Sequence, residues 1–127
     1  MVKVSLLRGF TLIELLVVMA LIGMLLSLSV PRYFGNVDKA KESVLRQNLA
    51  QMRDAIDKYF GDNGHYPESL DEIVARHYLR KIPTDPITDR SDSWIVIAPE
   101  KKETGNVFDI KSGAPGRARD GTDYASW

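Results

Sequence analysis

The stretch FTLIELLVVMALIGMLLSLSV, residues 10–30, decides how this chain must be arranged. Its only ionisable side chain is that of Glu14. A helix over this stretch would measure about 32 Å at about 1.5 Å per residue, which is enough to cross a hydrocarbon core of about 30 Å. The sequence therefore predicts a membrane-spanning helix near the N-terminus.

A secretory signal peptide is the alternative, because the short segment before the stretch carries Lys3 and Arg8. Such a peptide has an apolar region of about 7–15 residues, followed by a cleavage site with small residues. Here the apolar stretch is longer, and its end, SLSVPRYF (27–34), leads into another helical pattern instead of a turn. These two features favour a span that is retained.

A second helical pattern follows Pro31. Its apolar residues recur at intervals of three, four or seven, with charged residues between them. They are Val37, Val44, Leu45, Leu49, Met52, Ile56, Tyr59 and Phe60. Proline removes a helical hydrogen bond and clashes with the preceding turn, so we expect one long helix, kinked near Pro31 and ending at residues 61–64.

Shorter elements are predicted beyond this helix. In SLDEIVARHY (69–78), a serine is followed three residues later by a glutamate, the capping-box spacing of a short helix. Residues 65–67 are predicted to form a turn whose tyrosine packs on the domain. Residues 94–98 and 107–110 are rich in β-branched and aromatic side chains and predict two antiparallel strands, whereas the Gly-rich tail 112–127 is predicted to be irregular. About sixty residues form little core alone, so we expect the stripe of the long helix to supply the other half.

The composition argues against catalysis and nucleic-acid binding. Seventeen Lys and Arg balance seventeen Asp and Glu, there is no cysteine, and His65 and His77 are the only histidines. The absence of cysteine excludes disulfides, thiolate metal sites and a cysteine nucleophile. Asp85, Asp89 and Asp92 could form a carboxylate cluster, but no histidine or nucleophile lies near them in the sequence, and we interpret them as a solvated loop. We expect no enzyme activity and no cofactor.

Glu14 is the residue that needs an explanation. Inside hydrocarbon an acidic residue costs on the order of 2.5–3.5 kcal/mol on insertion scales. Cleavage between Gly9 and Phe10 would create an α-amino group one helical turn from Glu14, or on a neighbouring copy when the helices stack with an axial offset. We therefore expect Glu14 to pair with this new cation rather than to be a tolerated glutamate near the membrane edge.

The sequence LRGFTLIELLVV (7–18) closely resembles the class III signal of type IV pilins and pseudopilins. Gly9, Phe10 and Glu14 match the three defining positions of that family, and Pro31 matches its usual kink. The resemblance implies that prepilin peptidase cuts after Gly9 and methylates the new N-terminal Phe10. It covers only about the first thirty residues, so it indicates the superfamily and not the member.

Later motifs narrow the resemblance to the major pseudopilin of type II secretion. They are DNGHYP (62–67), the helix that contains Leu70, the pair Tyr78-Leu79, IPTDP (82–86) and the final Trp127. Motility and adhesion pilins more often close this region with a disulfide, which this chain cannot form. The resemblance implies a structural subunit of a type II secretion pseudopilus, a helical filament of identical copies that drives protein export.

The resemblance also implies partners and a fold. The partners are prepilin peptidase, an assembly ATPase, inner-membrane platform proteins and minor pseudopilins. The fold is α+β with a lollipop shape: a long kinked N-terminal helix packed on a small antiparallel sheet and a second short helix. The chain would divide into a cytoplasmic leader (1–9), a span that forms the filament core (10–30) and a periplasmic globular domain (31–127), anchored once in the inner membrane.

The orientation depends on the resemblance alone. Arg32, Lys39, Lys41 and Arg46 follow the span within about twenty residues, so the positive-inside rule by itself would place the C-terminal part in the cytoplasm. In the family that the chain resembles, the leader stays cytoplasmic and the globular part faces the periplasm. We follow the family here.

Major pseudopilins usually carry a calcium loop near the C-terminus. Where that family tends to read Gly-Ala-Asp-Gly, this chain has GAPG (113–116), so Pro115 stands in the place of a ligand carboxylate. Asp120 and Asp123 remain as oxygen donors suited to calcium. We predict no metal site, with calcium bound weakly or not at all.

Two other functions remain open. One is a true type IV pilin in motility, adhesion or DNA uptake, which long surface fibres at native expression would favour. The other is a single-pass membrane enzyme with its active site in the C-terminal domain. The missing cysteine, the isolated histidines and the small size of the domain argue against the enzyme.

Overall fold

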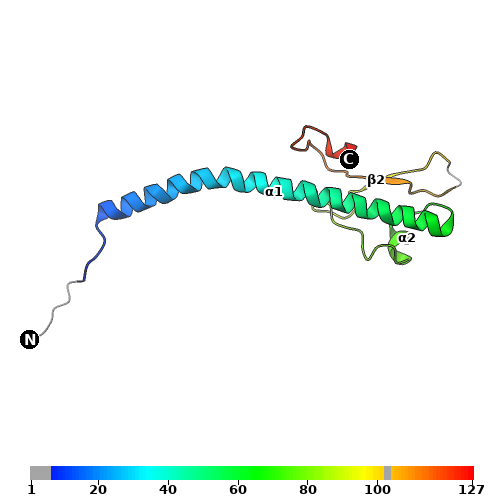
Figure 1. Ribbon diagram of the computed structural model, residues 1–127, viewed down its shortest axis with the longest axis horizontal. Helices are drawn as coiled ribbons and strands as arrows, with labels where there is room; N and C mark the ends of the chain where they lie inside the picture. Colours follow the sequence, from blue (N-terminus) through cyan, green and yellow to red (C-terminus); the bar gives the residue numbers. More distant parts are fainter. Residues whose placement is uncertain (1–6, 102–103) are drawn as a thin grey trace, which may run out of the picture. The chain divides into compact units, whose positions relative to one another are not determined.

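The computed structural model describes residues 7–101 and 104–127, so Lys3 and most of the predicted leader lie outside the described residues. The chain separates into two compact units, Met1–Val37 and Asp38–Trp127. The elements, in chain order, are the helices α1 (Leu12–Asn63) and α2 (Leu70–Ala75), the strands β1 (Ile95–Ile97) and β2 (Asp109–Lys111), and the 3₁₀ helix η2 (Tyr124–Ser126) (Figure 1). The predicted α+β fold is confirmed.

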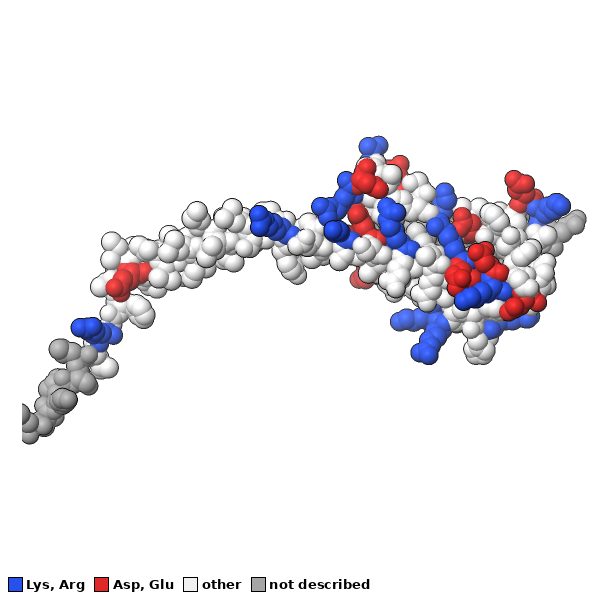
Figure 2. Space-filling model, in the orientation of Figure 1, with Lys and Arg blue, Asp and Glu red and all other residues white. Residues whose placement is uncertain are grey.

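The first unit contains the apolar part of α1. This helix has 52 residues and continues through Pro31, so the predicted kink at that residue stays a prediction. It starts at Leu12, two residues after the predicted start, and ends at Asn63 as predicted. Residues 7–34 are all exposed, and by length and composition the helix could cross a membrane. Figure 2 shows this part of the chain largely free of charged side chains, which gather over the second unit.

In the second unit, α1 supplies one side of the core. Its buried residues follow a spacing of three or four, as on one face of a helix: Leu45, Leu49, Met52, Ala55, Ile56 and Tyr59. They pack against Ile73, Leu79, Trp94, Val107, Ile110, Ala114, Ala118 and Tyr124. The predicted stripe is confirmed along its centre. At its edges it is wrong, because Val44 and Phe60 remain 44% and 38% exposed.

The predicted capping residue of α2 is confirmed. Ser69 precedes the helix, and its hydroxyl oxygen accepts the Glu72 N–H at 3.2 Å. The Glu72 carboxylate accepts the N–H of Glu68 at 2.8 Å and the hydroxyl of Tyr59 at 2.7 Å, which joins the start of α2 to α1. The helix is shorter than predicted because His77 has a φ of 66°, which a right-handed helix cannot contain.

The two predicted strands form an antiparallel pair. The register is Ile95 opposite Lys111, Val96 opposite Ile110, and Ile97 opposite Asp109. Both strands have three residues, fewer than predicted. The Val107 N–H is not free for the ladder, because it donates to the Pro67 carbonyl at 2.9 Å. Trp94, just before β1, is buried in the core, and its indole N–H donates to the Pro83 carbonyl at 2.8 Å.

Arg53 fixes β2 on α1. Its Nε lies 2.8 Å from Asp109 Oδ1, and its Nη2 donates to the Ile110 carbonyl at 2.9 Å and also to the carbonyl of Trp127. A single guanidinium with several donors in a fixed plane can hold two segments at once. The sheet and the end of the chain therefore share one attachment point on the helix.

The predicted packing of Tyr66 is confirmed, but the chain bends at residues 64 and 65, and residues 66 and 67 are irregular. Tyr66 is half-buried, stacks on Phe60 with ring centres 4.4 Å apart, and meets Phe108 edge to face at 5.4 Å. Gly105 runs against the Tyr66 backbone with a φ of 113°, and a Cβ at this position would overlap the Tyr66 carbonyl. Only glycine fits there without strain.

The interpretation of the aspartates as a solvated loop is wrong for Asp85. This residue is fully buried. Its Oδ1 accepts the Ile87 N–H at 2.8 Å, and its Oδ2 accepts the Ser112 hydroxyl at 2.5 Å. Asp89 and Asp92 are exposed, as expected. The sequence around Asp85 has the composition of a loop, but the carboxylate organises that loop from inside by accepting hydrogen bonds that water would otherwise donate.

Replacing Asp85 with asparagine should lower the free energy of unfolding by about 1–3 kcal/mol. The amide keeps an oxygen for the Ile87 N–H but turns an NH₂ group toward the Ser112 hydroxyl, whose hydrogen loses its acceptor. The matched variant Asp89→Asn changes an exposed side chain and should shift stability by less than about 0.5 kcal/mol. Urea unfolding of a soluble fragment, residues 32–127, followed by tryptophan fluorescence, measures both. Equal effects of the two variants would contradict the role of Asp85.

Candidate functional site

The predicted processing junction lies in exposed, non-helical chain. Residues 7–11 have no regular secondary structure, and α1 begins only at Leu12. Gly9 is exposed and Phe10 is 92% exposed. A peptidase has to bind the backbone on both sides of the bond that it cleaves, which exposed, irregular chain permits and a helix does not. The geometry at Gly9 and Phe10 is therefore suited to cleavage.

Glu14 lies in the first turn of α1, where it bonds to Thr11. Its Oε2 accepts the Thr11 N–H at 3.1 Å, and its own N–H donates to the Thr11 hydroxyl oxygen at 3.2 Å. This is a reciprocal capping box. It satisfies two N–H groups at the helix start, which would be costly to leave unpaired in hydrocarbon.

The capping role of Thr11 was not predicted. The sequence contains the signal, because Thr11 and Glu14 have the same spacing as Ser69 and Glu72, although a long apolar run follows them directly. The cap also explains the late start of α1, since the capping residue itself lies outside the helix. Glu14 thus has a hydrogen-bond partner in Thr11, directly before its own helix. Its pairing with an amine at Phe10 stays a prediction.

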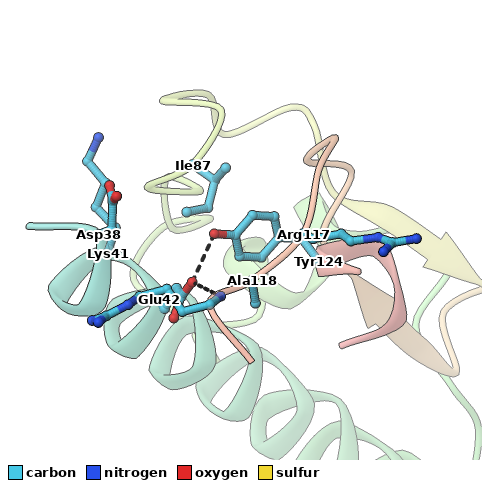
Figure 3. A pocket seen from close by; sticks show the side chains of 8 residues that line it. Asp38, Lys41, Glu42, Ile87, Arg117, Ala118 and Tyr124 are labelled. Carbon is cyan, nitrogen blue, oxygen red and sulfur yellow. Dashed lines mark hydrogen bonds between the residues drawn. The ribbon is translucent and has the colours of Figure 1, made fainter. Parts of the chain in front are cut away.

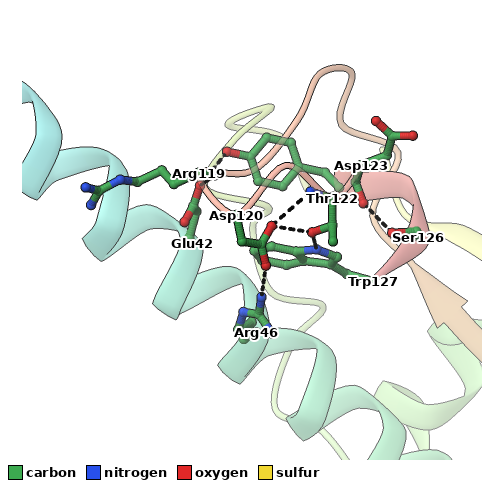
Figure 4. Close-up of polar contacts among 9 residues, drawn as sticks. Glu42, Arg46, Arg119, Asp120, Thr122, Asp123, Ser126 and Trp127 are labelled. Atoms are coloured by element: carbon green, nitrogen blue, oxygen red, sulfur yellow. Dashed lines mark hydrogen bonds and ion pairs between the residues drawn. The ribbon is translucent and has the colours of Figure 1, made fainter.

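The second candidate site is the C-terminal loop, which contains the possible calcium donors Asp120 and Asp123. Asp120 Oδ1 accepts the Thr122 hydroxyl at 2.6 Å and the Thr122 N–H at 3.0 Å (Figure 4). Its Oδ2 lies 3.4 Å from Nη2 of Arg46. Asp123 forms an ion pair of 3.3 Å with Arg117. Both carboxylates therefore face guanidinium groups.

These residues do not fit a calcium ion. Calcium takes six to eight oxygen ligands, several of them usually carboxylates. Here Pro115 offers no side-chain oxygen, and Asp120 and Asp123 are each paired with an arginine. Within residues 7–101 and 104–127, no group of three or more His, Asp or Glu residues is placed to hold a metal. The calcium loop that the resemblance implies has no matching set of ligands here.

Glu42 connects α1 to the same loop. Its Oε1 accepts the backbone N–H of Arg119 at 2.8 Å and the hydroxyl of Tyr124 at 3.1 Å (Figure 3). Burial, and then the hydrogen bond to Glu42, raise the pKa of the Tyr124 hydroxyl. Glu42 lines an open pocket together with Asp38, Lys41, Ile87, Arg117, Ala118, Arg119 and Tyr124. Since Glu42 already accepts hydrogen bonds from two donors of the loop, its role here is to position the loop.

Comparison with known proteins first defines the class. Residues 8–30 match the family model described as the prokaryotic N-terminal methylation motif. This match, together with the apolar helix that starts within it, indicates the class of proteins that carry this methylation motif.

The full-length comparisons define the family. Type II secretion system core protein G of Escherichia coli K12 is 31% identical, over 94% of this chain and 90% of the relative. The proteins of the same name from Klebsiella pneumoniae and Pseudomonas aeruginosa are 30% and 29% identical, each over 94% of both chains. The chain therefore belongs to the family of type II secretion system core protein G, the major pseudopilins. No solved structure gives a match to this chain.

The family bears on several expectations. The predicted class, a structural subunit of the type II secretion pseudopilus, is confirmed, and the alternative of a type IV pilin is not supported. The family is one of structural proteins. The chain's membership of this family and its exposed apolar helix fit a protein that is anchored in the inner membrane.

The Asp120 carboxyl should titrate below its ordinary value of 3.8, because the Thr122 hydroxyl and N–H lower its pKa by donating to the ionised form. A pKa lowered by folding means that these bonds stabilise the fold above pH 3.8, and that their contribution is lost as the pH falls through the folded value. Carboxyl-carbon NMR titration should show the pKa rising toward 3.8 in Thr122→Val. Ser126→Ala, in the same loop, should leave it unchanged. An unaltered pKa in Thr122→Val would contradict this assignment.

Proposed function

We propose that this chain is made as a precursor, cut between Gly9 and Phe10 by prepilin peptidase and N-methylated at Phe10. The processed chain then polymerises into a helical pseudopilus that drives export of folded proteins. One observation carries the proposal: a methylation motif at residues 8–30 covers the start of a helix whose apolar residues up to residue 34 are all exposed within the chain itself. Such a surface needs lipid before assembly and other copies after it.

The free energy of filament assembly depends mainly on how the helices fit together. When the apolar part of α1 leaves lipid for the same segment of neighbouring copies, apolar surface is exchanged for apolar surface. Little hydrophobic energy is gained, so close packing and polar contacts between helices decide the association. Glu14 is the only ionisable residue of this segment, residues 10–30, and is therefore the residue most able to set the register.

Cleavage creates a second possible partner for the Glu14 carboxylate. In the uncleaved chain its carboxylate accepts the Thr11 N–H. Once the preceding residues are removed, an ammonium at Phe10 of the same or a neighbouring copy competes for that carboxylate. An ion pair in low dielectric gains strong attraction but also carries a large desolvation cost, so its main effect is to fix the axial register of the copies.

We further propose the orientation and the partners. Residues 1–9 stay in the cytoplasm, residues 10–30 span the inner membrane, and residues 31–127 form the periplasmic domain. The compact unit Asp38–Trp127 falls within that proposed domain. An assembly ATPase, inner-membrane platform proteins and minor pseudopilins extract and arrange the processed copies. The family to which the chain belongs supports this arrangement.

Processing can be tested directly by mass spectrometry. Protein extracted from membranes of cells with prepilin peptidase should lack residues 1–9 and carry one N-methyl group on Phe10. Cells without the peptidase should yield the full chain, which serves as the control. An intact Met1 terminus in protein assembled into filaments would overturn the proposed cleavage.

The role of Glu14 can be separated from its capping role with two substitutions. Glu14→Ala removes both the charge and the acceptor for the Thr11 N–H, whereas Glu14→Gln removes the charge and keeps an acceptor oxygen. Both variants should be cleaved after Gly9, because neither changes the junction, and both should fail to form filaments or support secretion. The measurement compares sheared filaments and secreted protein at equal expression. A processed Glu14→Gln chain that assembles like the wild type would show that capping, and not the charge, is what matters.

A further inference from the structure

Arg46 contacts the C-terminal loop in two ways. Its guanidinium carbon lies 3.9 Å from the centre of the Trp127 ring, and its Nη2 lies 3.4 Å from Asp120 Oδ2 (Figure 4). A guanidinium over the face of a tryptophan is attracted by the ring electrons, and its planar shape suits stacking better than an ammonium does. One side chain of α1 thus contacts both an acid and an aromatic ring of the loop.

The loop closes a circuit of contacts around Arg46. The Trp127 indole N–H donates to the Thr122 hydroxyl oxygen at 2.7 Å, and the Thr122 hydroxyl donates to Asp120 at 2.6 Å. Asp120 in turn faces Arg46, which covers the Trp127 ring. Each member of the circuit orients the next, so the positive charge of Arg46 and the negative charge of Asp120 organise the four side chains together.

Glu42 holds the loop from the preceding turn of α1. It lies four residues before Arg46, so the two side chains leave the helix on the same face. Glu42 accepts the Arg119 N–H and the Tyr124 hydroxyl, at 2.8 Å and 3.1 Å. Glu42 therefore accepts hydrogen bonds from the loop, while Arg46 contacts the Asp120 carboxylate and the Trp127 ring. The negative charge of Glu42 thus lies beside hydrogen-bond donors of the loop, and the positive charge of Arg46 lies beside a carboxylate and the face of a ring.

We propose that Glu42 and Arg46 form a latch that holds residues 117–127 on α1 without a metal ion, with Arg46 supplying the positive charge that a bound cation would bring to this loop. A calcium ion at Asp120 would have to displace both the Arg46 guanidinium and the hydrogen bonds that Thr122 donates. The positive charge of the displaced arginine would then repel the ion. The latch lies wholly within the unit Asp38–Trp127, so it does not depend on the proposed filament function.

The test uses the full chain in detergent, treated with a chelator and then kept with or without calcium. Arg117 and Arg119 are exposed in the loop, so cleavage by trypsin after these residues reports its opening. We expect equal cleavage rates and equal unfolding temperatures of the wild type in chelator and in calcium. Arg46→Ala should be cleaved in the loop roughly fivefold faster. Arg80→Ala, which removes another exposed arginine outside the loop, should behave like the wild type.

Two results would overturn the proposal. One is a wild-type chain whose loop is protected, or whose unfolding temperature rises by many degrees, at micromolar calcium, because a bound ion stabilises the native state by mass action. The other is an Arg46→Ala chain cleaved at the wild-type rate. If Arg46→Ala does not fold, Asp120→Asn offers a milder variant, because it keeps an acceptor for Thr122 and loses only the charge. Its loop should be cleaved roughly twofold faster in low salt, with the difference shrinking in high salt.

Discussion

One uninterrupted helix has to satisfy two different surroundings. From Leu12 to Val30 no water is available to its backbone once it lies in a membrane, so every N–H and C=O must bond within the helix. From Leu45 to Tyr59 the same helix needs one apolar face and three sides that water can solvate. The chain meets both demands because the types of side chain differ along α1 while the backbone stays helical throughout. The helix α2, the strand β2 and the 3₁₀ helix η2 each bond to the part of this helix that lies in the second unit, and β1 is held by its pairing with β2.

A few charged side chains form hydrogen bonds to other segments of the chain and attach these segments to one another. Arg53 joins β2 and the end of the chain to α1, Glu72 joins α2 to Tyr59, and Asp85 organises the loop before β1 from a buried position. In each case one side chain takes part in more than one hydrogen bond, so a single residue holds several groups in place. The small sheet, with two strands of three residues, depends on these attachments because so short a hairpin is not stable alone.

Local pattern predicted the elements well, and long-range contacts explain what it missed. The end of α1, the cap at Ser69 and the pairing of the two strands follow from spacing and composition within a few residues. The burial of Asp85 depends on Ser112, and the role of Arg46 depends on Asp120, 74 positions later. No local pattern carries that information. Thr11 was different, because its spacing to Glu14 was visible. Gly9, Phe10 and Glu14 as sites of processing and assembly rest on the motif and stay predictions.

The way in which the core is distributed along α1 has a mechanical consequence. Its buried residues run from Leu45 to Tyr59, about 21 Å along the helix axis. A force that pulls or pushes α1 along this axis loads all of these contacts in shear at the same time, instead of opening them one after another as peeling would. Arg46 and Arg53 add cross-links within the same interval. An axial load on this helix is thus shared among many contacts at once, which suits a subunit that is part of a filament.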